Sequence, residues 1–272
     1  MKTNSIFLAA IFLLLVATCV PATVLYVDLS CTNATPPYAD WPTAATNIQD
    51  AIDASTNGDL ILVTNGVYSS GSRILGDGTT NRVAVTKAVT LQSVSGPAAT
   101  AIDGGNTMRC VYLTNGTVLA GFTITNGSIS GTGFRGQGGG VYCLSRTAFV
   151  LNGVLRNNIA TSANFAGPFG GGIFQGTLSN CTLIQNSAKS GGGGAYGSYL
   201  NNCMVVSNIV ISGDGGGTKH CYLANCSLIA NKIVGGGYGG GAFGETLVNC
   251  TFANNVSSYR GGGTASATNI IV

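Results

Sequence analysis

Carboxylates and basic side chains gather in one part of this 272-residue chain, between residues 73 and 109. Asp77 and Asp103 stand 26 residues apart there, and Arg109 follows shortly after the second of them. Two carboxyl groups that face each other at a fixed separation can act as acid and base in glycoside hydrolysis. The sequence therefore makes Asp77, Asp103 and Arg109 weak candidates for a catalytic site.

A structural role is favoured for the same residues. Asp77 stands in GDGTTN and Asp103 in IDGGN, and such segments are typical of turns in which Asp accepts hydrogen bonds from its own backbone. Asp214 and Glu245 lie 31 residues apart, which is more than one period of the repeat described below, so we do not expect them to pair. The single histidine, His220, has no matching carboxylate or serine and is interpreted as a strand or surface residue.

No cofactor or metal site is predicted. The stretch GTGFRG at residues 131–136 matches a dinucleotide-binding pattern in letters, but no strand-to-helix context follows it. SGDGGGT resembles a calcium-binding repeat only through Asp214, and an array of that kind needs the Asp on successive turns. The repeated cysteines occur once per repeat without the partner ligands of a zinc site.

The residues named above lie in or next to a sequence repeat, so the structure of the repeat determines where they stand. Its first half occurs as LSNCTLIQN, LNNCMVVSN, LANCSLIAN and LVNCTFANN, with Cys181, Cys203, Cys226 and Cys250 separated by 22, 23 and 24 residues. Gly121 and Gly153 occupy the cysteine position in two earlier units. The second half is a run of three glycines, which begins at Gly138, Gly170, Gly192, Gly215, Gly239 and Gly261. A fixed period of this length predicts a solenoid.

Two solenoid folds fit the first half of the repeat. Leu223, Cys226, Leu228 and Asn231 have the spacing of a leucine-rich repeat, whose second half would be a helix or turn. Three consecutive glycines each cost about 1 kcal/mol in a helix relative to Ala, so the second half is not helical. An extended strand with closely approaching neighbours suits it better. We therefore predict an all-β parallel β-helix.

In such a coil, successive turns pair about 4.8 Å apart. We expect Leu223, Cys226 and Leu228 to point inward, and Asn225 to occupy a tight bend, where Asn tolerates left-handed backbone angles. Two asparagine columns should pass amide hydrogen bonds along the coil and satisfy buried turn backbone; they are Asn180, Asn202, Asn225 and Asn249, and Asn186, Asn208, Asn231 and Asn255. Stacked cysteines fall within the separation that disulfides require, but spacing does not establish connectivity.

The N-terminus predicts export. MKTNSIFLAAIFLLLVATCVPA has Lys2, an apolar stretch at residues 6–17 and a small-residue end, which is typical of a secretory signal peptide cut after Ala22. The apolar stretch is shorter than the roughly 20 residues that a membrane span needs. Thr18 is unfavourable before a lipidated Cys19. A retained anchor and lipidation are therefore minor alternatives, and we expect a secreted or cell-surface protein without a membrane span in the mature chain.

Composition excludes some partners. Charged residues make up 8% of the chain, against about 25% in ordinary domains. Loss of Lys2 with the signal peptide leaves 11 of the 12 basic residues against 9 acidic ones. The basic residues are scattered singly and lack interleaved aromatics, so nucleic acid is not an expected partner.

A short helix is predicted just before the repeats. Thr46 with Gln49 three residues later forms a capping box, and Ile48, Ala51 and Ile52 make one apolar stripe. We expect this helix to cover the open end of the coil, which would otherwise expose strand backbone and core side chains.

The chain resembles the secreted bacterial right-handed parallel β-helix repeat proteins of the pectin-lyase-like superfamily. The resemblance rests on the helix followed by GDLILVTNGVY, on AIDGG at residues 101–105 and on the alternating NCT and GGG[AI][YF] units, over roughly residues 24–272. The glycine units are also similar to those of polymorphic outer-membrane proteins, whose passengers are adhesin-like. The resemblance implies a right-handed coil. For enzymes on this scaffold it implies carboxylate clusters for hydrolysis, or Ca²⁺-binding carboxylates with an Arg or Lys base for pectate elimination.

These features suggest a domain organisation and two functions. The expected parts are a signal peptide at residues 1–22, an N-terminal segment with the capping helix at 23–57, and the β-helix at 58–272, which we expect to continue in the natural protein. The leading hypothesis is a structural or adhesive protein that binds a polysaccharide or cell-surface glycan through the loops at residues 127–137 and 159–169. The rival hypothesis is a polysaccharide lyase or glycoside hydrolase. The repeat motifs do not distinguish the two hypotheses, because they specify a fold better than a function.

Overall fold

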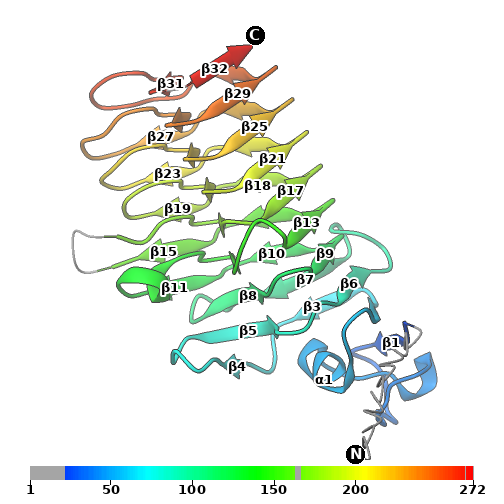
Figure 1. Cartoon of the computed structure of the whole chain (residues 1–272). Helices are drawn as coiled ribbons and strands as arrows, with labels where there is room; N and C mark the ends of the chain where they lie inside the picture. The colour runs from blue at the N-terminus through cyan, green and yellow to red at the C-terminus, as the bar shows by residue number, and fades with distance from the viewer. Residues whose placement is uncertain (1–21, 163–166, 267, 272) are drawn as a thin grey trace, which may run out of the picture.

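The computed structural model describes residues 22–162, 167–266 and 268–271. These residues form a coil of short strands whose turns stack along one axis, from a helix near the N-terminus to the last strand at the opposite end (Figure 1). The predicted signal peptide, apart from Ala22, lies outside the described residues, as do residues 163–166 of the second predicted binding loop. In the described part, no helix has the length and apolar character that a membrane crossing requires.

The strands of the described residues belong to four sheets, three of which run along most of the coil, while the fourth lies only within residues 128–233. Sheet A contains β1 (Val24–Val27), β2 (Leu60–Val63), β6 (Thr90–Ser93), β9 (Val118–Ala120), β13 (Phe149–Leu151), β17 (Thr177–Ser179), β21 (Tyr199–Asn201), β25 (Tyr222–Ala224), β29 (Thr246–Val248) and β32 (Thr268–Ile271). Sheet B contains β3 (Gly66–Tyr68), β7 (Thr100–Asp103), β10 (Thr123–Thr125), β14 (Val154–Arg156), β18 (Thr182–Ile184), β22 (Met204–Val206), β26 (Ser227–Ile229) and β30 (Thr251–Ala253). Sheet C contains β4 (Arg73–Ile74), β5 (Thr80–Val85), β8 (Arg109–Leu113), β12 (Val141–Cys143), β16 (Ile173–Phe174), β20 (Ala195–Tyr196), β24 (Thr218–Lys219), β28 (Ala242–Phe243) and β31 (Thr264–Ala265). Sheet D contains β11 (Ser128–Ser130), β15 (Ile159–Thr161), β19 (Ser187–Ala188), β23 (Ile209–Val210) and β27 (Lys232–Ile233).

Strands that neighbour each other within a sheet come from successive turns of the coil. They pair in parallel and in register, so that Leu178 lies beside Leu200 and Leu200 beside Leu223. The hairpin of β4 and β5 is antiparallel. Parallel strands joined by a crossover in one sheet are right-handed in nearly all proteins. The chain is therefore a right-handed parallel β-helix, as predicted, and strands rather than helices follow its triple glycines.

The triple glycines are required by close backbone packing between turns. A Cβ atom on Gly193 would lie 2.4 Å from the carbonyl oxygen of Gly216 and 2.6 Å from that of Ile209. Both atoms belong to backbone that is hydrogen-bonded into neighbouring strands, so neither can move away cheaply. The predicted close approach of neighbouring turns is thus confirmed, and it explains why this half of the repeat has no side chains.

Gly193→Ala is expected to lower the free energy of unfolding by about 2–3 kcal/mol, because overpacking against a rigid wall forces the backbone apart. Urea unfolding followed by circular dichroism would measure the loss. Gly76→Ala is the matched control, since its Cβ would meet open space. Equal stability of the two variants would show that the turns can separate without cost.

Apolar side chains and cysteines fill the interior of the coil. Cys181, Cys203 and Cys226 are buried and Cys250 is half-buried, so the predicted inward cysteine column is present. Each thiol donates to backbone carbonyls, as Cys226 does to Ala224 O at 3.2 Å. The cysteines of the described residues are all free thiols, so the column packs without disulfides.

The two asparagine columns differ in their environment. Asn186, Asn208 and Asn231 are fully buried, and each binds the next asparagine along the coil, as in Asn186 Nδ2 to Asn208 Oδ1 at 3.0 Å. The other column has the expected positive φ, for example 54° at Asn180 and 48° at Asn249, but it faces solvent. The expectation that it satisfies buried backbone is wrong, because its bends lie on the outside of the coil.

The N-terminal helix α1 (Ile48–Ala54) packs against β1, β2 and β5. Its buried stripe of Ile48, Ala51 and Ile52 is as predicted. The predicted capping box is wrong, because the N-cap is Asn47, whose side chain accepts from Asp50 N at 2.9 Å. Gln49 instead turns inward and accepts from Ala84 N of β5 at 2.8 Å. The 3₁₀ helices η1 (Trp41–Thr43) and η2 (Gly133–Gly136) lie in connecting segments.

Candidate functional site

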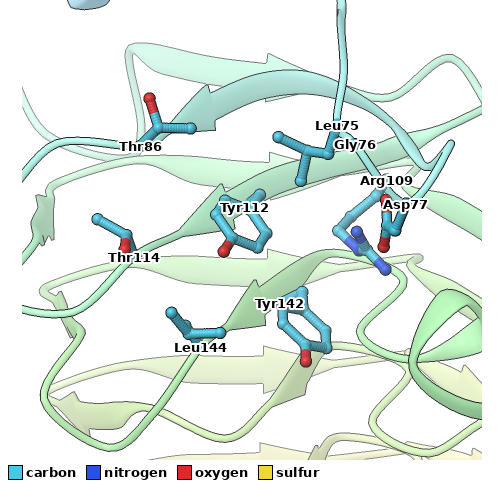
Figure 2. A pocket seen from close by; sticks show the side chains of 9 residues that line it. All are labelled: Leu75, Gly76, Asp77, Thr86, Arg109, Tyr112, Thr114, Tyr142 and Leu144. Carbon is cyan, nitrogen blue, oxygen red and sulfur yellow. The ribbon is translucent and has the colours of Figure 1, made fainter.

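A pocket of about 420 Å³ opens on sheet C, between the β4–β5 hairpin and the strands β8 and β12. We call it the Arg109 pocket. Its lining residues are Leu75, Gly76, Asp77, Thr86, Arg109, Tyr112, Thr114, Tyr142 and Leu144. Figure 2 shows Asp77 and Arg109 at one end of this pocket and Thr86 and Thr114 at the other, with the two tyrosines between them.

The turn of the hairpin holds Asp77 at the rim. Gly78 adopts a φ of 83°, which suits glycine, and Asp77 Oδ1 accepts from Thr79 N at 2.9 Å and from Thr79 Oγ1 at 2.7 Å. Partial burial raises the pKa of Asp77, but the hydrogen bonds from Thr79 and the attraction of Arg109 and Arg135 outweigh burial and hold it below the ordinary value. Asp77 is therefore a carboxylate at neutral pH and cannot act there as a general acid.

Arg109 is the buried cation of the pocket, with 2% of its surface exposed. Its Nη1 donates to Asn81 Oδ1 at 2.9 Å, its Nη2 to Gln137 O at 2.8 Å and its Nε to Gly138 O at 3.1 Å. These acceptors are neutral oxygens. Burial lowers the pKa of Arg109 to about 10, and the attraction of Asp77 opposes this shift. The guanidinium still carries its charge at neutral pH, and a fixed set of acceptors holds it in place.

Stacked aromatic rings continue from the pocket along sheet C. The rings of Tyr112 and Tyr142 lie 5.8 Å apart and nearly parallel, and Phe174 and Tyr196 extend the stack. The strand register produces the stack, because these four residues are partners on successive turns. Arg109 Cζ lies 4.9 Å from the centre of the Tyr142 ring, which adds a cation–π contact. The pocket thus combines a positive charge with rigid aromatic walls.

The structure brings two of the three predicted site residues together. Asp77 and Arg109 line the same pocket, whereas Asp103 ends β7 in sheet B and is not one of the lining residues. Asp103 Oδ1 accepts from Gly105 N at 2.7 Å and Oδ2 from Asn126 Nδ2 at 3.1 Å, as expected for a turn residue. Asp77 and Asp103 therefore do not line the same pocket, and the β4–β5 hairpin interrupts the repeat between them.

The other titratable residues that the sequence raised lie apart. Asp214 forms an ion pair with Lys219 at 2.9 Å on the outside of sheet C. Glu245 is fully buried inside the coil. His220 is exposed, has a φ of 55° and packs edge-on against Tyr196. Among the residues that the structure describes, no group of three or more His, Cys, Asp or Glu could hold a metal ion.

Sequence reasoning missed the tyrosines and Asn81. Tyr142 belongs to the GGGVY unit and Tyr112 to CVYL, so both occupy the aromatic position that follows the inward residue of a repeat strand. That regularity could have identified a continuous aromatic column. Nothing in the sequence shows that Asn81 accepts from Arg109, because the contact depends on the register of β5 against β8.

What the site can do chemically follows from its composition. Asp77 is the one carboxylate among the nine lining residues, so the pocket lacks the carboxylate pair that glycoside hydrolysis uses. A buried arginine, a carboxylate at the rim, two threonine hydroxyls and aromatic walls suit a ligand that carries a negative charge, hydroxyl groups and an apolar face.

The fold resembles those of several solved structures. A rhamnogalacturonan lyase matches with a TM-score of 0.45 at 12% identity, covering 83% of this chain and 68% of that one. A pectate lyase matches with a TM-score of 0.44 at 12% identity over the same shares. A pectin methylesterase from carrot matches with a TM-score of 0.44 at 11% identity, covering 93% of this chain and 89% of that one. No protein-family profile matches the chain, and no curated protein is significantly similar to it in sequence.

Proposed function

We propose that this protein binds an acidic polysaccharide, with the carboxylate of one sugar held by Arg109. The observation that carries the proposal is the environment of Arg109, whose buried guanidinium donates to neutral oxygens among the described residues. Burying a charge is costly unless an opposite charge compensates it, and Asp77 does so only from the exposed rim. A ligand carboxylate would complete the compensation.

The rest of the pocket suits the body of a sugar. Leu75, Leu144 and the tyrosines offer apolar surface to its C–H groups, and Thr86 and Thr114 offer hydroxyls. Asp77, as a carboxylate, accepts from sugar hydroxyls. Its negative charge lies at the same end of the pocket as Arg109, so it favours a pose in which hydroxyls, and not the ligand carboxylate, face Asp77. We place this binding on a secreted or cell-surface protein, following the predicted signal peptide.

Arg109→Ala is expected to weaken binding of polygalacturonate about 10- to 100-fold, because a hydrogen bond to a charged group contributes about 1.5–3 kcal/mol. Isothermal titration calorimetry would measure the affinity at two salt concentrations. Polygalacturonate whose carboxyl groups have been reduced should bind the wild-type chain weakly. Its affinity should be no higher than the affinity of Arg109→Ala for unreduced polygalacturonate. Arg156→Ala removes an exposed arginine of sheet B and is the matched control.

Loss of folding must be separated from loss of binding, since Arg109 also ties β8 to the segment before β12. Arg109→Lys keeps the charge but not the forked donors, and circular dichroism would verify both variants. Equal binding of native and carboxyl-reduced polymers, or full affinity in a folded Arg109→Ala chain, would contradict the proposal.

A second candidate function is polysaccharide elimination, favoured by the depressed pKa of Arg109 inside a pocket. At alkaline pH, the uncharged fraction of Arg109 would take the proton next to the uronate carboxyl group. The C–O bond to the neighbouring sugar would break to leave a carbon–carbon double bond, and the departing sugar oxygen would take a proton from water. Ultraviolet absorbance of the unsaturated product tests this directly. Binding without such a product would leave the protein as a polysaccharide-binding, adhesive coil.

A further inference from the structure

The hairpin turn that forms one wall of the Arg109 pocket also lines a second hollow. Residues 75–77 face the Arg109 pocket, whereas residues 78–80 face a hollow of about 310 Å³. The remaining lining residues of this second hollow are Thr107, Met108, Ser128, Ile129, Ser130 and Arg135. Because consecutive residues of one turn line both spaces, the two hollows are neighbours with the turn between them, and a ligand that occupies both would have to cross the turn.

The second hollow has its own positive charge. Arg135 projects from η2, in the segment between β11 and β12, and is exposed. Thr80, Ser128 and Ser130 supply hydroxyls, and none of the lining residues is acidic. The carboxylate of Asp77 lies close enough to both Arg109 and Arg135 to be attracted by each. Each of the two neighbouring hollows therefore has one arginine, Arg109 in the first and Arg135 in the second.

We propose that the second hollow is a second anion-binding subsite, in which Arg135 meets a carboxylate or sulfate on the sugar next to the one held by Arg109. The proposal rests on the proposed function of the Arg109 pocket. Asp77 stands in the turn between the two hollows and repels an anion placed there, so ligands whose negative groups are separated by a neutral, hydroxyl-bearing stretch are favoured. Neighbouring sugars of an acidic polysaccharide have this arrangement.

The test compares ligands with one and two anionic groups. Galacturonic acid and digalacturonate are titrated into the wild-type chain and into Arg135→Ala. The variant should bind digalacturonate about fivefold more weakly, since an exposed ion pair contributes up to about 1 kcal/mol. It should bind galacturonic acid as the wild type does. Arg109→Ala should weaken both ligands, and Arg156→Ala neither.

A chondroitin sulfate disaccharide and its desulfated form distinguish the two sources of the second charge. If the wild type prefers the sulfated disaccharide to the desulfated one and Arg135→Ala does not, the subsite binds sulfate. If the wild type prefers digalacturonate to galacturonic acid and Arg135→Ala does not, the subsite binds a carboxylate. If Arg135→Ala changes the affinity for neither, while Arg109→Ala still weakens binding, the second subsite is wrong and the proposed function stands. If the wild-type chain binds none of these ligands, both proposals fail.

Discussion

Asn208→Ala is expected to destabilise the coil by about 3–6 kcal/mol, enough to unfold a domain of ordinary stability. Asn208 Nδ2 donates to Leu183 O at 2.9 Å and to Asn231 Oδ1 at 3.0 Å. Its Oδ1 accepts from the backbone N and the Nδ2 of Asn186. Ala would remove these four bonds in a position with no exposed surface. Asn186 N would lose the acceptor it has here, whereas Asn231 Oδ1 and Asn186 Nδ2 would each keep one other bond. Each orphaned buried group costs about 1–3 kcal/mol.

The outer asparagine column provides the matched control. Asn202 is exposed and has a φ of 52°, so Asn202→Gly keeps the backbone geometry and should change stability by less than about 1 kcal/mol. Both variants are compared by urea unfolding, and Asn208→Asp tests the donors separately because it retains the acceptor oxygen. Similar losses in Asn208→Ala and Asn202→Gly would show that burial of the inner column has no special energetic role.

The architecture was predictable because the repeat specifies it redundantly. The pattern of Cys226, Leu228 and the glycines at 215–217 recurs on several successive turns, and each recurrence excludes the same alternatives. The identity of Asn did not reveal whether a column is buried, since Asn suits an exposed left-handed bend and a buried amide ladder equally well. Whether the Asn side chain is buried depends on whether the bend points it into or out of the coil, and the strands on either side of the bend determine this.

The candidate site was less predictable because it lies where the repeat is interrupted. The hairpin of β4 and β5 inserts residues into the first turns, so counting 26 residues between Asp77 and Asp103 did not place them on one face. Arg109 was found through its charge, whereas Asn81 and Gln137, which hold it, are polar residues in a Gly- and Thr-rich segment. Sites built from insertions escape arguments that use periodicity.

Glu245 is a further residue whose environment the sequence did not indicate. It stands at the inward position just before β29, where the two preceding turns carry Ser198 and Cys221. It has no exposed surface, and its Oε2 accepts from Cys221 N. Burial raises the pKa of Glu245 to about 8, and hydrogen bonds from Cys221 and Thr218 reduce the shift. The folded chain therefore keeps this carboxyl group protonated at neutral pH.

The stability of the coil should consequently fall as pH rises from about 4.5 to about 8. In this window the unfolded chain releases the Glu245 proton and the folded chain retains it, so deprotonation favours unfolding. Below the window both states are protonated, and above it both are ionised, so this contribution is constant outside it. A pKa difference of this size corresponds to about 3–5 kcal/mol across the whole window.

Glu245→Gln is expected to remove that dependence, because an amide has the same shape and no charge to lose. The variant and the wild type should be about equally stable at pH 4.5, and the variant should be more stable by about 3–5 kcal/mol at pH 8. Thermal unfolding at pH 4.5, 6, 7 and 8 measures the difference. Asp214→Asn is the control of opposite sign, since it removes one charge of a partly buried ion pair with Lys219 and should lower stability. A stability gain in Glu245→Gln that stays constant across these pH values would mean that the buried carboxyl group is not held in its protonated form.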